Sequence, residues 1–169
     1  TVTPMGKRLL RQWLLAPLNA VDPIVERHDG VAVLVNDARG RERLRDALDG
    51  VRDMERLVGR AAANRASPRD LGALRDSLGR LPDTKNSLDG LGERDSSVML
   101  TRIVEQFDLH ADLSDRLSRS LVDRPGTAIG DGDTFRSGVD QALDELDNVF
   151  CTLAVFRVEC DTDTRTDIQ

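Results

Sequence analysis

The sequence SPRDLGALRDSLGRLP, residues 67–82, contains the signals for the start and the apolar face of an α-helix. Ser67 and Asp70 have the spacing of a capping box, in which each side chain binds the other residue's backbone N–H. Pro68 takes the first helical position, where a missing N–H does no harm. The apolar residues then recur at steps of three and four, the period of one helical face: Leu71, Leu74, Leu78 and Leu81. This segment therefore predicts an amphipathic helix that packs on one side.

The same kind of start signal occurs twice nearer the N-terminus. A Thr-Pro pair at residues 3–4 opens TVTPMGKRLLRQWLLAPL, residues 1–18, and predicts a helix that ends before Pro17. An Asp-Pro pair at residues 22–23 precedes a second helical run. Four residues of that run share one face: Ile24, His28, Val31 and Val35. Both runs are therefore expected to be amphipathic helices.

Residues 41–48 and 53–65 have the same helical period, and no sustained two-residue alternation occurs before residue 148. Aromatic residues make up only 3% of the 169 residues. The sequence therefore predicts an all-α fold, a multi-helix bundle. We expect seven residues to form its structural core: Met5, Leu9, Trp13, Val31, Leu57, Leu74 and Leu78.

Three segments interrupt the helical pattern. Polar, glycine-containing residues 83–97 are expected to form a turn or an irregular connection. A shift in the apolar register predicts a break at residues 108–111, and residues 124–138 predict a loop or a small hairpin before a further helical start. We expect the helical domain to occupy residues 1–147.

The composition changes at Asn148. The run VFCTLAVFRVE is β-branched and aromatic, and it fits either a strand or a helix packed on the bundle, because periodicity does not separate the two over so short a length. Residues 148–169 are therefore expected to be a separate, divergent segment, short and extended or irregular. Its polar tail from Cys160 onward is expected to be disordered.

No pattern in the sequence predicts a catalytic, cofactor-binding or metal site. His28 and His110 lie apart from each other and from any cysteine, and Cys151 and Cys160 fit no zinc or redox spacing. The segment DGDTFRSGVDQA does not fit a calcium-binding loop. A phenylalanine stands at a ligand position, and an arginine stands where the loop needs glycine. Gly6-Lys7 has no phosphate-loop context. The isolated chain is therefore not expected to be an enzyme, and no cofactor is expected in it.

Four ordered segments nevertheless resemble the core or lever domain of the MutS family of DNA mismatch repair proteins. The most specific patterns are T-x-x-G-x-R-x-L-x-x-W-L-x-x-P-L near the start, and D-x-E-R-L-x-x-R followed by P-R-D-L, within residues 53–71. The segments VERHDGVAVLV and DGDTFRSGVDQALDELD complete the resemblance. It covers the chain from Thr1 to about Asp147 and stops there, since the residues that follow do not resemble the long charged helix of the family.

The resemblance implies a role inside a larger protein. Members of the family are ATP-dependent dimers that clamp DNA, recognise mispairs through an N-terminal domain and hydrolyse ATP, with Mg²⁺, in a C-terminal domain. The segment that this chain resembles joins the nucleotide sites to the clamp. The implied partners are other domains of the same protein, a second copy, and mismatched duplex DNA held by other domains. A cytoplasmic location without a membrane is implied, and no functional residue of the family maps onto this chain.

Two other interpretations follow from the residues alone. The chain fits a stand-alone helical interaction protein that binds a partner through its apolar faces and neither DNA nor ATP. Direct DNA binding would use the arginine run at residues 39–45, although a solvated helix face paired with Glu42 and Asp46 explains that run as well. The net charge of −6 argues against a major phosphate-binding surface, but it leaves room for local basic patches.

The charged residues suggest adaptation to concentrated salt. The chain has 2 lysines among its 24 basic residues, and 23 of its 30 acidic residues are aspartate. We therefore expect the free energy of unfolding to increase as KCl is raised to the molar range. Chemical unfolding at a series of KCl concentrations measures this, and an unfolding midpoint that does not rise would refute the hypothesis.

Overall fold

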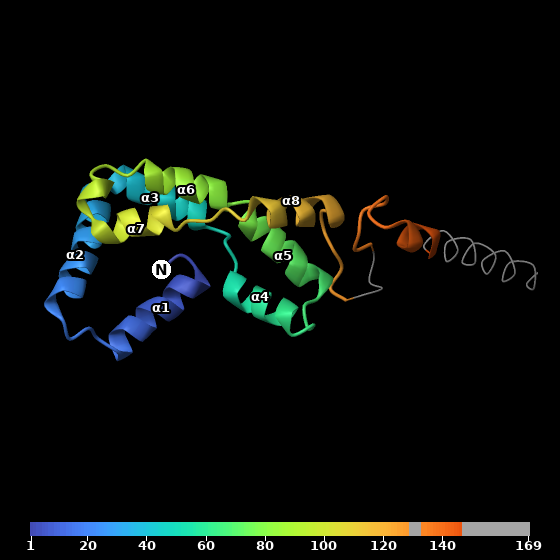
Figure 1. Ribbon diagram of the computed structural model, residues 1–169, viewed down its shortest axis with the longest axis horizontal. Helices are drawn as coiled ribbons and strands as arrows, with labels where there is room; N and C mark the ends of the chain where they lie inside the picture. Colours follow the sequence, from blue (N-terminus) through green and yellow to red (C-terminus); the bar gives the residue numbers. More distant parts are fainter. Residues whose placement is uncertain (129–132, 147–169) are drawn as a thin grey trace, which may run out of the picture.

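The computed structural model describes residues 1–128 and 133–146, and these residues form helices joined by short connections (Figure 1). The helices are α1 (Pro4–Leu15), α2 (Val21–Asn36), α3 (Ala38–Leu48), α4 (Met54–Ala62), α5 (Pro68–Leu78), α6 (Leu81–Asp89), the short 3₁₀ helix η1 (Arg94–Ser96), α7 (Val98–Glu105) and α8 (Ala111–Ser120). Residues 141–146 are also helical. Within the described ranges the only β-type pairing is one antiparallel bridge between Leu121 and Phe135. The all-α prediction is confirmed.

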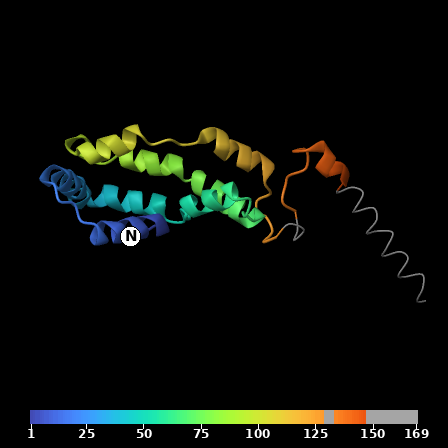
Figure 2. The same ribbon diagram turned by 60° about the horizontal axis from the view of Figure 1, so that its bottom comes forward.

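The helices pack as two groups with separate cores, placed end to end (Figures 1 and 2). One group comprises α2, α3, α6 and α7, with α3 against α6 and α2 against α7. Its buried residues are Val33, Leu44, Leu88, Leu91 and Leu100. The other comprises α4, α5 and α8, and its buried residues are Leu74 and Leu78 of α5 together with Leu81, the first residue of α6. Phe107 packs against both cores, so it joins the two groups.

Side chains cap the N-termini of two of the three helices whose start signals the sequence contains. Thr3 Oγ1 accepts a hydrogen bond from the Gly6 N–H at 3.0 Å at the start of α1. Ser67 and Asp70 form a complete capping box at the start of α5, with the Ser67 N–H donating to Asp70 at 2.8 Å. The exception is α2, which begins at Val21 without a side-chain cap, one residue before the predicted Asp-Pro pair.

Asp37 joins α3 to the connection that follows α6. Its carboxylate accepts hydrogen bonds from the Gly92 N–H at 3.0 Å and the Gly40 N–H at 2.8 Å. The bond from Gly92 and then the bond from Gly40 lower the pKa of Asp37 below its ordinary value, because both stabilise the ionised form. One aspartate therefore both caps a helix and fixes a connection 55 residues away in sequence.

The predicted core is partly wrong. Leu74 and Leu78 are buried, and Leu57 is half-buried against them. Val31, however, is 54% exposed, because α2 turns Gly30 and Val33 toward α7 instead. A Cβ at residue 30 would lie 2.4 Å from the terminal methyl carbon of Met99, so the Met99 side chain occupies the space beside this glycine.

Helix α1 also departs from the prediction. Leu9 is 48% exposed and is therefore not a core residue, and Met5 and Trp13 are half-buried. The physical reason is that α1 contributes no buried residue to either core. Its apolar face is open to solvent along much of its length.

The connections are shorter than the polar composition suggests. Residues 83–97 were expected to be irregular, but α6 extends through Asp89 because Leu81, Thr84 and Leu88 are buried on one face and Pro82 lies in its first turn. The predicted break at residues 108–111 is confirmed by the gap between α7 and α8. The bridge between Leu121 and Phe135 supports the predicted hairpin-like connection. Residues 148–169, with the predictions made for them, lie outside the described residues.

Truncation of a residue in the second core tests this division into buried and exposed positions. Leu78→Ala is expected to lower the free energy of unfolding by about 2 to 5 kcal/mol, because it leaves a cavity beside Leu74 and Leu81. Val31→Ala is the control and should change it by less than about 0.5 kcal/mol, since that side chain is exposed. Urea unfolding measures both, and equal losses would contradict the assignment.

Candidate functional site

The two most specific motifs of the sequence meet in space. Arg8 of α1 forms ion pairs with Asp53 and Glu55, which lie at the start of α4. Its Nη2 is 2.8 Å from Asp53 Oδ1 and 2.6 Å from Glu55 Oε2. Asp53 Oδ1 also accepts a hydrogen bond from the Arg56 N–H at 3.2 Å and so caps α4. The arginine of the first motif is thus held by the acidic residues of the second.

A second ion pair links α4 to α5. Arg60 of α4 lies 3.1 Å from Asp70, the acidic residue of the α5 capping box. Burial raises the pKa of Asp70, but hydrogen bonds from the Ser67 N–H and hydroxyl and the charge of Arg60 outweigh it, so the net shift is downward. We call Arg8, Asp53, Glu55, Arg60 and Asp70 the junction. It connects α1, α4 and α5 through charged residues that belong to the sequence motifs. The motifs alone do not show which of these residues pair with one another.

The junction changes the ionisation of its own groups. The hydrogen bond from Arg8 is the largest cause of the lowered pKa of Asp53, and it prevails over the desolvation that raises that pKa. The same bond raises the pKa of Arg8, with Glu55 adding to the effect. Both shifts favour the charged forms, so the pair stabilises its own ionised state.

A second polar contact holds the other end of α1. The Arg27 guanidinium of α2 lies over the ring of Trp13, 3.7 Å from the ring centroid. A cation over the face of an indole is attracted by the ring quadrupole. Trp13, expected to be a core residue, is therefore held by a cation–π contact at the surface.

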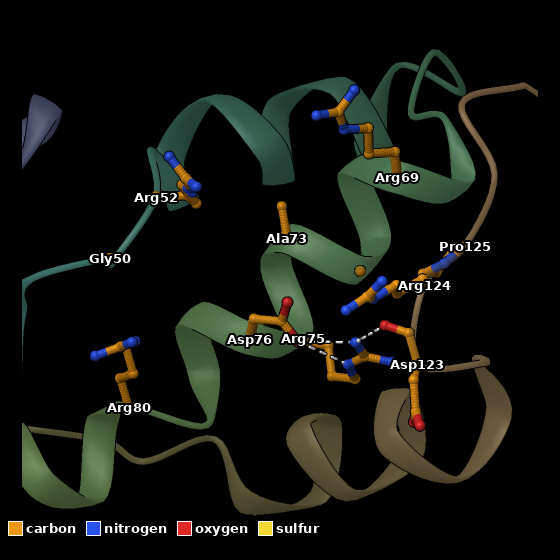
Figure 3. Close-up of a pocket in the computed structure, with 11 residues that line it drawn as sticks. Gly50, Arg52, Arg69, Ala73, Arg75, Asp76, Arg80, Asp123, Arg124 and Pro125 are labelled. Carbon is orange, nitrogen blue, oxygen red and sulfur yellow. Dashed lines mark hydrogen bonds and ion pairs between the residues drawn. The ribbon is translucent and has the colours of Figure 1, made fainter.

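A hollow of about 640 Å³ opens beside α5 and the segment that follows α8 (Figure 3). Five arginines line it, together with two aspartates: Arg52, Arg69, Arg75, Arg80, Arg124, Asp76 and Asp123. Sequence reasoning missed this site because its residues come from separate segments and form no linear motif. The excess of arginine over lysine was the only signal, and it gives no location.

The arginine run at residues 39–45 does not form a comparable site. Arg41 donates to the carbonyl of Leu34 at 2.6 Å, and Arg43 donates to the carbonyl of Gly90 at 3.3 Å. No ion pair to Glu42 or Asp46 occurs in the part of the chain that the structure describes, so the expected pairing is wrong. Arg41 and Arg43 instead bind carbonyl groups near helix ends, and Arg39 and Arg45 are exposed.

The described residues also contain no group of three or more histidine, cysteine or acidic side chains arranged to hold a metal ion. His28 is exposed, and His110 precedes α8 with a φ of 47°. Among residues 1–128 and 133–146, no helix is both long and apolar enough to cross a membrane.

The fold and the junction define an α-helical module whose motif residues join helices to one another. Residues 1–162 match the family model described as MutS domain III, and the chain belongs to this family.

Curated relatives agree with this assignment. The chain is 42% identical over 146 residues to the DNA mismatch repair protein MutS of Synechococcus elongatus, which covers 86% of the chain and 16% of the relative. It is 40% identical over 152 residues to that of Methanosarcina acetivorans, covering 88% and 17%, and 37% identical over 146 residues to that of Chlorobaculum tepidum, covering 86% and 16%. The chain therefore spans about one sixth of the length of these relatives.

Acid should weaken the junction. Asp53 and Asp70 of the junction have folded-state pKa values below their ordinary ones, as does Asp37 outside it. The stabilisation by these carboxylates is therefore present above about pH 4 and is lost as the pH falls toward those lower values. Asp53→Asn keeps a side chain able to cap α4 but removes the charge, and it should flatten the fall of unfolding free energy between about pH 5 and 3.

Asp46→Asn is the matched control because Asp46 is exposed and makes no side-chain contact within the described residues. Its unfolding free energy should follow that of the parent across the same pH range. Urea unfolding at each pH measures both variants. Equal acid sensitivity of Asp53→Asn and the parent would show that the Arg8 pair contributes nothing to stability.

Proposed function

We propose that this chain is the helical lever segment of a MutS-type DNA mismatch repair protein, which carries conformational change between an ATPase domain and a DNA clamp. The observation that supports this most directly is the junction, since Arg8 ties α1 to α4 across 45 residues of sequence. Membership of the MutS domain III family supports the proposal as well, because a lever needs its helices to be attached to one another.

The physical argument is rigidity. Capping side chains and ion pairs fix the ends of α1, α3, α4 and α5, and Phe107 joins the two packed groups. Helices fixed in this way move as a body when one end is displaced, which is how many conformational changes are transmitted. In this proposal ATP, Mg²⁺ and mismatched DNA are bound by other parts of the protein, which works as a homodimer, and this chain takes no catalytic step.

One observation favours a second candidate, a stand-alone interaction protein. Several large apolar side chains are exposed on α1 and α2: Leu9, Leu10, Leu14, Leu15, Val21, Val25, Val31 and Val35. A mismatch repair protein would cover them with its other domains, whereas a stand-alone protein would use them to bind a partner. A segment of a larger protein should self-associate when alone, and size-exclusion chromatography of the chain detects this.

A chimaera tests the proposed function. The matching segment of the Synechococcus elongatus protein is replaced by this chain, and the product is expressed in bacteria that lack their own MutS. We expect the spontaneous mutation rate to fall close to that given by the unaltered relative. Introducing Arg8→Glu into the chimaera should raise the rate again, because the glutamate is repelled by Asp53 and Glu55.

Arg39→Glu is the matched control, since Arg39 is exposed and makes no side-chain contact within the described ranges. It should leave the mutation rate unchanged. A chimaera that accumulates normally but does not lower the mutation rate would contradict the proposed function. Unimpaired repair by the Arg8→Glu chimaera would show that the junction has no part in transmission.

A further inference from the structure

The arginine-lined hollow holds more positive charge than its own carboxylates neutralise. Asp76 is paired with Arg75 at 2.8 Å, and Asp123 is paired with Arg136 at 2.6 Å. The other four arginines of the lining have no carboxylate partner in the ranges that the structure describes: Arg52, Arg69, Arg80 and Arg124. The chain as a whole has a net charge of −6, so acidic groups that could pair with these arginines are available within it.

The walls of the hollow are fixed by internal contacts. The Arg75 guanidinium donates to the carbonyls of Val122 at 2.7 Å and Asp123 at 2.9 Å, which holds the segment after α8 against α5 (Figure 3). On the other side, the Arg52 N–H donates to the hydroxyl of Ser77 at 3.0 Å, and Ser77 is fully buried in α5. The four unpaired arginines are therefore attached to a scaffold that is already held in place.

The unpaired arginines are spread along α5 instead of converging on one point. In Figure 3, Arg52 and Arg80 lie to one side of Ala73, and Arg69 and Arg124 lie to the other. Arg69 and Arg80 are eleven positions apart, which corresponds to about 16 Å along a helix axis. This spacing fits an extended peptide that carries carboxylates at intervals better than it fits a single compact anion.

A segment with these properties lies in the same chain, outside the described residues. Residues 159–167, ECDTDTRTD, have four carboxylates and one arginine. Three of the carboxylates stand at alternate positions: Glu159, Asp161 and Asp163. In an extended chain, alternate side chains point to the same face, and nine residues span about 26 Å. The segment is therefore long enough to bring carboxylates to both sides of the hollow.

The chain that leads to this acidic segment starts beside the hollow. The Arg136 guanidinium donates to the Asp123 carboxylate at 2.6 Å, and the Arg136 N–H donates to the Ser120 carbonyl at 2.9 Å. Glu159 follows Arg136 by 23 residues. A stretch of that length reaches at most about 80 Å, and about 26 Å when it is coiled. Because the two partners are joined in this way, the acidic segment has a higher local concentration at the hollow than a separate molecule has.

We propose that the hollow lined by Arg52, Arg69, Arg80 and Arg124 binds the acidic segment at residues 159–167 of the same chain. The guanidinium groups pair with its carboxylates, which match the fork of N–H donors on arginine. Each ion pair between exposed groups is weak, so the contact depends on several pairs together and weakens as salt is raised. It does not rest on the lever role proposed above.

A spin label on Cys160, within the acidic segment, tests this with the full chain. Cys151→Ser leaves Cys160 as the only cysteine, and the label broadens the NMR signals of backbone amides that lie near it. We expect the amides of Gly72 and Ala73, which line the hollow, to be broadened at low salt relative to the chain with a reduced label. The broadening should disappear in about 1 M KCl, where charges are screened over about 3 Å.

The double variant Arg69→Gln/Arg124→Gln should lower the ratio of bound to free segment at least about threefold. Both side chains are exposed and have no side-chain hydrogen bond or ion pair in the described part of the chain, so circular dichroism should show the parent fold. The matched control is Arg39→Gln/Arg45→Gln, which removes the same charge from exposed positions on α3, away from the hollow. It should leave the broadening unchanged.

The acidic side of the contact has its own variant, Asp161→Asn/Asp163→Asn, which should also reduce the broadening. The proposal is overturned if the amides of the hollow are not broadened at low salt, or if the two arginine variants behave alike. It is also overturned if a spin-labelled chain broadens the same amides of a separate, ¹⁵N-labelled chain as strongly as its own, since the occupant is then a second copy.

Discussion

The helices of this chain are short, and that length is the constraint on which the rest of the structure depends. The helices α1 to α8 run from 8 residues in α7 to 16 in α2. Isolated helices shorter than about 12 to 15 residues are marginal in water, so their stability must come from packing and from closed ends. The two leucine-rich cores supply the packing, and Thr3, Asp37, Asp53, Ser67 and Ser97 close the helix starts with side-chain hydrogen bonds.

The same constraint gives aspartate a local structural role. The short side chain of aspartate is well suited to accept hydrogen bonds from the free N–H groups of the first helical turn. Asp37 and Asp53 cap helices in this way, and each also binds a group far away in sequence: Gly92 in one case and Arg8 in the other. Capping and long-range attachment therefore use the same carboxylate group, and in Asp37 each of the two oxygens accepts one of the two bonds. The helix ends are thus points at which distant parts of the fold are attached to each other.

Local signals were predictable from sequence because their causes are local. The Thr3 cap, the capping box at Ser67 and the break before α8 depend only on neighbouring residues, and the structure has all three. The buried side of a helix depends on what packs against it, so Leu9 and Val31 were assigned to a core that they do not enter. The family motifs could be recognised from spacing alone, whereas the ion pairs between them and the arginine-lined hollow require the folded chain.

Helix α5 belongs to both polar sites, and this has a mechanical consequence. Its first turn carries Asp70, which binds Arg60 in the junction, while Arg69 and Arg75 of the same helix line the hollow. Its last turn carries Ser77, whose buried hydroxyl holds Arg52 and thereby the connection into α4. A helix fixed at both ends cannot shift at one site without displacing groups at the other.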